Sequence, residues 1–407
     1  MAHPVGRPWD GINMTTPPPP LNGLRILDVG HEIGGPFCAR LLARLGADVI
    51  KIEPPLGDPV RRRPPFRPGA RAGESGALHL YVNEGKRGIV LDLAVPSGRA
   101  LFLRLVEDAD VVVENLGPRV LPGLGLDFTL LQSVNPRVVL TSISDYGDSG
   151  PYRDYHGGEL ALFAMGGHMY RSGTADRPPI QMGGHPAQVL VAINAAYATL
   201  AALRHQRQYG GQHVTCSVFE SQVTSHAQAM VEISYYGAET GAGLPRGADG
   251  LRGVLARDGL AMVSAQEQQM ARLAELVGAP REVGEANPMD RGEQRRQLAA
   301  YVEQWAAGQT RREVYEKSQR AHVPASYVAD PADLLSSPQY AARGFIREVE
   351  HPDAGRVSIP GLPFQWLGAE PPMRPAPRLG EHTVEVLEAV GITRRAITQL
   401  TGAGVVA

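Results

Sequence analysis

The feature that most constrains the fold is a strand–helix–strand unit near the start of the chain. Two apolar runs, Leu24–Gly30 and Ala47–Pro55, flank a segment with helical spacing at Pro36–Gly46. Pro36 suits the first turn of a helix, and Gly46 is a stop signal at its end. Such a unit implies parallel strands joined by a right-handed crossover. Strands and helices continue to alternate as far as Ser144, so the sequence predicts an α/β fold with a doubly wound sheet.

The length of 407 residues exceeds one ordinary core and predicts two domains. Residues 1–20 end in four prolines and are expected to form a disordered tail. The alternating pattern indicates a large Rossmann-like domain over residues 21–225. After Tyr235 the chain becomes glycine-rich, and a short strand and several charged helices follow. We therefore expect a smaller α+β domain over residues 226–330.

Composition and short motifs exclude several classes of function. The net charge is −2, from 40 basic and 42 acidic residues, so no basic field favours nucleic acid. The two cysteines, Cys38 and Cys216, are too few for a disulfide framework or a metal cluster, which points to a reducing compartment. The first strand leads into GHEIGG, which lacks the dinucleotide-binding spacing, so no NAD site is expected. The basic run Arg61–Arg63 is expected to be a solvated loop rather than a phosphate site.

Targeting and membrane signals are not recognisable in the sequence. The N-terminus lacks the basic and apolar regions of a signal peptide. The most apolar stretch, Val189–Leu203, is too short and too interrupted to span a bilayer. A cytoplasmic enzyme with a small-molecule substrate and no membrane partner is therefore expected.

Candidate reactive groups concentrate between Asp145 and Gln188. One loop, rich in glycine, aspartate and proline, leads to Glu159 at the start of an apolar helix, and His156 precedes it. A second loop carries His185 and ends at Gln188, where a long helix of small residues begins. Polar groups delivered by loops onto helix starts suit a reaction centre.

A second pair of candidates follows the first strand. His31 and Glu32 stand at its carboxyl end, where α/β sheets bind ligands. An imidazole and a carboxylate side by side can carry out acid–base chemistry. A structural loop contact is the alternative for this pair, as a surface position is for His156.

Several ordered blocks of sequence resemble one known family over nearly the whole chain. They include LNGLRILDVG, GGPFCARLLARLGADVIKIEPPLGDP, NEGKRGIVLDL, YGDSGPY and, near the end, PAPRLGEHT. The chain is similar in these blocks to the family III CoA-transferases (the CaiB/BaiF group), which include formyl-CoA transferase. The α-methylacyl-CoA racemases share that fold.

The resemblance implies an interlocked homodimer in which the C-terminal part, residues 331–407, returns to the large domain. It also implies a site for coenzyme A or an acyl-CoA as substrate. The positions that match the family's CoA contacts are Ile33, Gly34, Val82, Asn83, Lys86, Arg87, Asn115, Leu116, Gly117, Ser144, Asp145 and Tyr146. A Lys86–Arg87 pair near helix starts would be a sensible cradle for the phosphates of CoA.

The resemblance fails at the reacting residue. The family's transferases use an aspartate nucleophile, and Gln188 takes its place here. A carboxamide is neither a useful nucleophile nor a base. The racemases would need a histidine where Gly158 stands and an acid where Gln188 stands. The family's carboxylate at Glu159 is retained.

Three hypotheses follow from the sequence. The main one is acid–base chemistry on an acyl-CoA or a related substrate, such as isomerisation, elimination or cyclisation, with Glu159 assisted by His31, His156 or His185. The second is an ordinary transfer of CoA between carboxylic acids, in which Glu159 substitutes for the missing nucleophile. The third is a non-catalytic subunit that forms a heteromer with an active paralogue.

Overall fold

The computed structural model describes residues 17–71, 73–173, 177–225, 227–236, 252–265, 267–284, 291–365 and 373–407. These residues form two compact units. The first takes in the described chain up to Met169, Gln181–Met230 and Phe345–Ala407, and the second takes in Tyr170–Ile180 and Val231–Gly344. The sequence placed the end of the small domain at residue 330, whereas the chain rejoins the first unit at Phe345.

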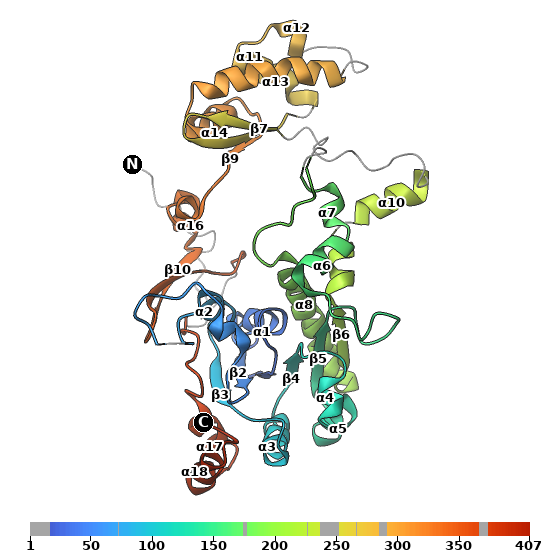
Figure 1. The fold of residues 1–407 in the computed structure, drawn as a ribbon, viewed down its shortest axis with the longest axis vertical. Coiled ribbons are helices and arrows are strands. Elements are labelled where there is room, and N and C mark those ends of the chain that lie inside the picture. The colour runs from blue at the N-terminus through green and yellow to red at the C-terminus, as the bar shows by residue number, and fades with distance from the viewer. Residues whose placement is uncertain are drawn as a thin grey trace. The chain divides into compact units, whose positions relative to one another are not determined.

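The first unit is built on a parallel sheet of six strands in the order β3-β2-β1-β4-β5-β6 (Figure 1). The strands are β1 (Arg25–Asp28), β2 (Asp48–Glu53), β3 (Arg87–Val90), β4 (Val111–Glu114), β5 (Val139–Ser144) and β6 (His213–Ser217). This is the order of a doubly wound Rossmann-like sheet. The predicted α/β fold class is confirmed.

Helices cover both faces of this sheet because its strands are apolar on both sides. Ile26 of β1 and Val113 of β4 point into one core, whereas Leu27 and Val112 point into the other. The helices that pack in the first core are α1 (Gly34–Arg44), α8 (Pro186–Tyr209) and α9 (Val218–Thr224). Those in the second core are α3 (Pro96–Val106), α5 (Phe128–Val134), α17 (Thr383–Ala389) and α18 (Arg394–Gly402).

Shorter elements complete the first unit. They are a 3₁₀ turn (Pro59–Arg62), α2 (Ala77–Val82), α4 (Val120–Gly123), α6 (Gly158–Met165) and the antiparallel hairpin β10 (Ile346–His351) and β11 (Gly355–Pro360). Two helices, α7 (His168–Arg171) and α10 (Ala227–Tyr236), carry the chain across the boundary between the units.

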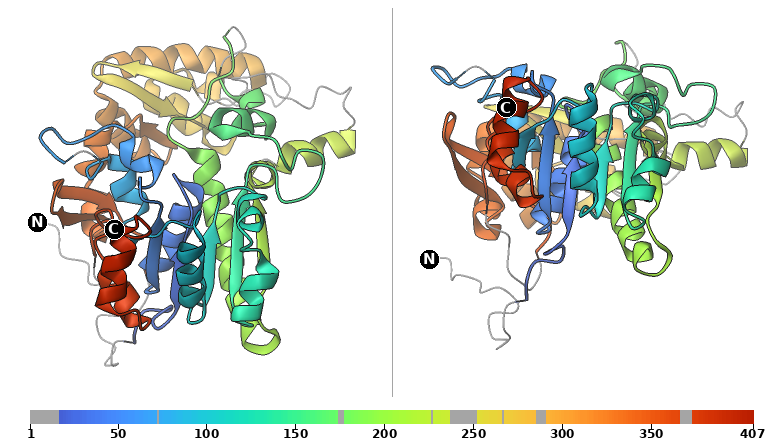
Figure 2. Two further views of the ribbon diagram at one scale, coloured as in Figure 1. Left: turned by 60° about the horizontal axis from the view of Figure 1, so that its bottom comes forward. Right: turned by 90° about the horizontal axis from the view of Figure 1, so that it is seen from below.

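The C-terminal segment closes an edge of the sheet. Strand β3 is the edge strand, and its Gly88 N–H and Val90 N–H donate to His382 Nδ1 and Thr383 Oγ1, both at 3.1 Å. Helices α17 and α18 lie beside the blue strands although they end the chain (Figures 1 and 2). An exposed strand edge is a template for unwanted pairing, and these side chains cover it.

Helix α8 combines length with an apolar composition. By those two criteria alone it could cross a membrane, although 44% of the tested window is buried inside the structure. Its inner face packs against the sheet through Ala187, Val191 and Ala195. A core helix of a soluble protein has the same length and composition.

The second unit holds a three-stranded antiparallel sheet in the order β7-β8-β9. Its strands are β7 (Arg252–Ala256), β8 (Gly259–Val263) and β9 (Ala325–Tyr327). Its helices are α11 (Met270–Val277), α12 (Arg281–Gly284), α13 (Arg291–Ala307), α14 (Arg311–Arg320), α15 (Pro331–Leu335) and α16 (Pro338–Arg343), with a 3₁₀ turn at Glu267–Gln269. Val254, Ala261 and Leu273 contribute to a separate apolar core.

Candidate active site

A cavity of about 630 Å³ opens in the first unit at the carboxyl ends of β1, β4 and β5. Strands β1 and β4 are the central neighbours at which the strand order reverses. A doubly wound sheet binds its ligands at this switch point. Residues from the starts of α6 and α8 complete the wall. All six predicted catalytic positions line the cavity, namely His31, Glu32, His156, Glu159, His185 and Gln188.

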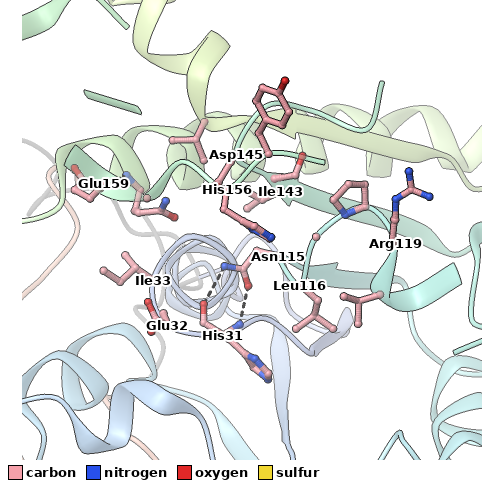
Figure 3. Close-up of a pocket in the computed structure, with 18 of the residues that line it drawn as sticks. His31, Glu32, Ile33, Asn115, Leu116, Arg119, Ile143, Asp145, His156 and Glu159 are labelled. Atoms are coloured by element: carbon pink, nitrogen blue, oxygen red, sulfur yellow. Dashed lines mark hydrogen bonds between the residues drawn. The ribbon is translucent and has the colours of Figure 1, made fainter. Parts of the chain in front are cut away.

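The turn between β1 and α1 is held by the side chain of Asn115. The His31 N–H donates to Asn115 Oδ1 at 2.6 Å, and Asn115 Nδ2 donates to the His31 carbonyl at 2.9 Å (Figure 3). A Cβ atom on Gly30 or on Gly35 would lie 2.8 Å from Asn115 Oδ1. The two glycines therefore make room for the clamp that joins the β1 and β4 loops.

A buried ion pair also supports the turn between β1 and α1. Glu32 has a φ of 60°, and its N–H donates to Asp58 at 3.0 Å. Asp58 in turn pairs with Lys51 at 3.0 Å, both side chains being fully buried, and Lys51 also donates to the Gly30 carbonyl. Burial alone would raise the pKa of Asp58, but the Lys51 ammonium and backbone N–H groups outweigh it and hold that pKa well below its usual range. The left-handed conformation of Glu32 is therefore held by surrounding contacts.

His31 and Glu32 differ in whether the side chain is available to a substrate. Burial and the nearby Lys51 ammonium lower the pKa of His31, so its imidazole is neutral at neutral pH and can accept a proton or a hydrogen bond. The Glu32 carboxylate is already paired with Arg63 at 2.7 Å. Of the two, His31 is the group free to act on a substrate.

Glu159 lies where the starts of α6 and α8 meet. Its carboxylate accepts the Ala187 N–H at 2.8 Å and the Gln188 N–H at 3.2 Å. His185, the residue before α8, makes no capping hydrogen bond with its own side chain, so Glu159 performs that task from a different helix. Two helix N-termini stabilise the negative charge of this carboxylate.

Gln188 reaches from α8 towards the start of α1. Its Oε1 lies 2.8 Å from the place that a Cβ atom on Gly34 would occupy. Its backbone N–H is bound to Glu159, so the side chains of Gln188 and Glu159 share one corner of the cavity. The carboxamide can donate or accept hydrogen bonds there.

The loop between β5 and α6 closes the opposite wall. Asp145 Oδ2 accepts the Gly157 N–H at 2.7 Å, which folds the loop back on itself. Tyr146 packs edge-on against Tyr152 and Tyr155. His156 stands at the end of this loop and faces the cavity with Asp145 (Figure 3).

The positions matched to CoA contacts divide into two groups. Ile33, Asn115, Leu116, Gly117, Ser144 and Asp145 line the cavity, and Gly34 and Tyr146 flank it in the chain. Val82, Asn83 and Lys86 are buried, and Arg87 is paired with carboxylates that do not line the cavity. Lys86 Nζ donates to Asp28 at 2.7 Å and to Asn83 at 2.8 Å, and burial lowers its pKa to about 8 although Asp28 opposes this.

Arg87 pairs with Asp48 at 2.6 Å and with Glu385 at 2.9 Å. With both charges engaged, the Lys86–Arg87 phosphate cradle inferred from the resemblance does not form in this structure. Lys86 instead holds β1 and the start of α1 together through Asp28 and the Pro36 carbonyl.

Three arginines that line the cavity were not among the candidates chosen from the sequence, namely Arg63, Arg119 and Arg153. The run Arg61–Arg63 was expected to be a solvated loop, which holds for the exposed Arg62 but is wrong for Arg61. Arg61 is buried against Glu53 and Glu74, both at 2.7 Å, and Arg63 faces the cavity. The rule that ligands bind at the carboxyl ends of parallel strands selected Glu32. The carboxylate of Glu32 was the one sequence signal that could have suggested an arginine nearby.

Metal ligands are not clustered in the part of the chain that the structure describes. Among the described residues, no group of three or more histidine, cysteine, aspartate or glutamate side chains could hold a metal ion. The two cysteines are unpaired thiols, and burial raises the pKa of Cys216 to about 11.

Comparison with known proteins identifies the family. Residues 21–383 match CoA-transferase family III. The chain belongs to this family. It is an enzyme of the CoA-transferase family III type, as the resemblance implied.

Two curated relatives and one solved structure illustrate the similarity. A succinyl-CoA–D-citramalate CoA-transferase of Chloroflexus aurantiacus is 32% identical, over 94% of this chain and 97% of its own. A succinyl-CoA–L-malate CoA-transferase β subunit from the same organism is 31% identical, over 92% and 95%. A crystal structure of a CAIB/BAIF family protein from Brucella suis aligns with a TM-score of 0.80 at 27% identity, over 92% of this chain and 100% of that one. Both curated names describe transfer of CoA, and neither describes the isomerisation, elimination or cyclisation expected first from the sequence.

Proposed function

We propose that this family III member moves CoA from an acyl-CoA to a free carboxylic acid, with Glu159 as the carboxylate that carries the intermediate. The observation that supports this is the place of Glu159. It lies in the cavity beside Gln188, the residue that the resemblance puts at the nucleophile's position, and two helix N-termini hold it. The second hypothesis from the sequence thus replaces the acid–base hypothesis, which the names of the relatives do not support.

The proposed reaction is balanced without any further reactant. A Glu159 carboxylate oxygen attacks the thioester carbonyl, the C–S bond breaks, and CoA leaves as a thiolate, which gives a mixed anhydride. The thiolate then attacks the Glu159 carbonyl and releases the first acid as its carboxylate. The acceptor acid displaces CoA from Glu159 in the same manner, and the thiolate finally attacks the acceptor's carbonyl and frees Glu159.

The N–H groups that bind Glu159 have a role in these steps. Attack of the thiolate on the Glu159 carbonyl places negative charge on an oxygen that Ala187 N–H or Gln188 N–H already contacts. Donors fixed where charge develops lower the barrier most effectively in a cavity that excludes water. The Gln188 carboxamide supplies a further donor in the same corner.

The CoA thioester is placed along the wall formed by Ile33, Asn115–Gly117 and Ser144–Asp145. Ile33 and Asn115–Gly117 follow the switch-point strands β1 and β4, Ser144–Asp145 lie at the end of β5, and all of them line the cavity that contains Glu159. We place His31 beside them as a neutral hydrogen-bond partner, with His156 and His185 on the facing wall. Calorimetric titration with CoA tests this placement, and Asn115→Ala, which removes the turn's clamp, is expected to weaken binding.

The chain is proposed to act in the cytoplasm as a homodimer, with CoA as a substrate rather than a resident cofactor. Large apolar side chains on α6 and α8, including Leu160, Met165, Ile193 and Tyr197, are exposed in the single chain and suit a subunit interface. One relative is named as a β subunit, so a heteromer with an unlike chain is the alternative assembly. Light scattering from the purified chain distinguishes the two, since only the homodimer forms from this chain alone.

The proposal is tested by exchange between an acyl-CoA and a labelled acid with the chain as sole protein. Wild type is expected to form the labelled acyl-CoA. Glu159→Gln, which keeps size and removes the nucleophile, is expected to lower kcat by about a thousandfold or more. Glu107→Gln, an exposed change of the same kind at the end of α3, serves as the matched control. Full activity of Glu159→Gln would refute the assignment.

A further inference from the structure

The arginines of the active-site cavity are not equivalent. Arg63 is paired with Glu32 at 2.7 Å, and Arg119 forms a two-pronged pair with Asp154. Arg153 lines the same cavity and has no ion pair with any carboxylate among the described residues. Its Nε is buried and lacks a hydrogen-bond partner within that part of the chain. A buried donor without a partner calls for an explanation, and a missing ligand is one.

The carboxylates that line the cavity give Arg153 an electrostatic role. Glu32 and Asp154 are neutralised by their arginines, whereas Asp145 and Glu159 accept backbone N–H groups and form no ion pair within the part of the chain that the structure describes. Two carboxylates without cationic partners repel an incoming acid. Arg153 is the arginine of the described cavity wall whose charge remains available to offset that repulsion.

We propose that Arg153 binds a second carboxylate of the acid substrate, so that this enzyme acts on dicarboxylic acids. The inference rests on the proposed function, because it assumes that one carboxyl group of the acid reacts at Glu159. A monocarboxylic acid has only one anionic group. If that group reacts, Arg153 stays unpaired, and if it pairs with Arg153, it cannot react. A dicarboxylic acid can react through one carboxyl group at Glu159 while its other carboxylate pairs with Arg153.

The chemistry of the guanidinium group supports a carboxylate at this position. Its planar fork matches two carboxylate oxygens and remains charged at every physiological pH. A phosphate of CoA presents similar oxygens and is the other possible source of an anion in this cavity. Because Arg153 belongs to the loop that leads directly to Glu159, we assign the anion to the acid and not to the distant phosphates of CoA.

Equilibrium binding measurements distinguish a carboxylate of the acid from a phosphate of CoA as the anion that Arg153 binds. They do not require turnover. Calorimetry measures the affinities of succinate and butyrate, of glutarate and valerate, and of CoA. The proteins are wild type, Arg153→Gln, Arg153→Lys and Arg104→Gln. Arg104 is exposed on α3 and pairs with Glu107, so Arg104→Gln changes the net charge equally and lies outside the cavity. Arg153→Lys keeps the charge without the planar fork and guards against a folding defect in Arg153→Gln.

Wild type and Arg104→Gln are expected to bind each diacid about tenfold or more tightly than its matched monoacid. Arg153→Gln should abolish that preference while the affinity for CoA is kept, and Arg153→Lys should retain part of it. An unchanged preference in Arg153→Gln overturns the inference. So does weaker CoA binding with the preference intact, which would assign Arg153 to a phosphate. Loss of CoA exchange in wild type would refute the proposed function while leaving the binding preference measurable.

Discussion

Replacing Asp58 by asparagine tests whether the buried ion pair holds the β1–α1 turn. Asp58 and Lys51 are both fully buried at 3.0 Å, and the change leaves Lys51 with Asp28 at 3.9 Å and the Gly30 carbonyl. Breaking a buried pair by removing one partner costs about 3–5 kcal/mol. Because Lys51 keeps some partners, we expect the lower end, about 3 kcal/mol, which corresponds to roughly 150-fold faster amide exchange.

Hydrogen exchange followed by mass spectrometry reports this locally, on peptides that cover β1 and the start of α1. Asp48→Asn, on the strand β2 that carries Lys51, is the matched control, because Asp48 is partly exposed and its pairs with Arg25 and Arg87 are worth about 1 kcal/mol at most. The pKa of Asp58 is depressed in the folded state, so its contribution is full above the unfolded pKa of about 3.9 and is lost as pH falls. Equal exchange rates in the two variants at neutral pH would refute the role assigned to the pair.

Two other substitutions probe residues that adjoin the cavity lining in the chain, Glu114 before Asn115 and Gly34 after Ile33. Burial raises the pKa of Glu114 to about 7, so wild type should lose stability as pH rises from about 4.3 to 7. Glu114→Gln should remove this loss and gain about 3 kcal/mol relative to wild type at pH 8, measured by urea unfolding at several pH values; parallel pH profiles for the two proteins would contradict this. Gly34→Ala should displace Gln188, since the new Cβ would lie 2.8 Å from its Oε1. The thermal midpoint should fall and recover in Gly34→Ala with Gln188→Ala, and failure of the second change to restore it would argue against that contact.

The sheet was predictable because its strands carry their own signal. Apolar runs between glycine and proline place β1 and β2 within a few residues of Arg25–Asp28 and Asp48–Glu53. The rule that ligands bind at the carboxyl ends of parallel strands selected His31 and Glu32, and both line the cavity. By contrast, β7 begins within a glycine-rich stretch, and β9 has three residues, too few for a periodic pattern.

The charged groups were harder to predict because their state depends on partners distant in the sequence. Lys86 looked like a turn cation, yet it is buried against Asp28, 58 residues earlier. Arg61 looked solvated, yet Glu53 and Glu74 enclose it. Arg153 became notable only when the structure paired Arg119 with Asp154 and Arg63 with Glu32. A charge in a loop is usually solvated, so sequence reasoning starts from that assumption.

If Glu159 carries the CoA between two acids, a covalent intermediate forms on its side chain and can be trapped there. The most direct measurement is mass spectrometry of the chain after incubation with an acyl-CoA and trapping with hydroxylamine or borohydride, followed by peptide mapping. We expect a hydroxamate or a reduced side chain at Glu159, and no such product in Glu159→Gln. Transfer of CoA with the modification on another residue, or with none at all, would contradict it.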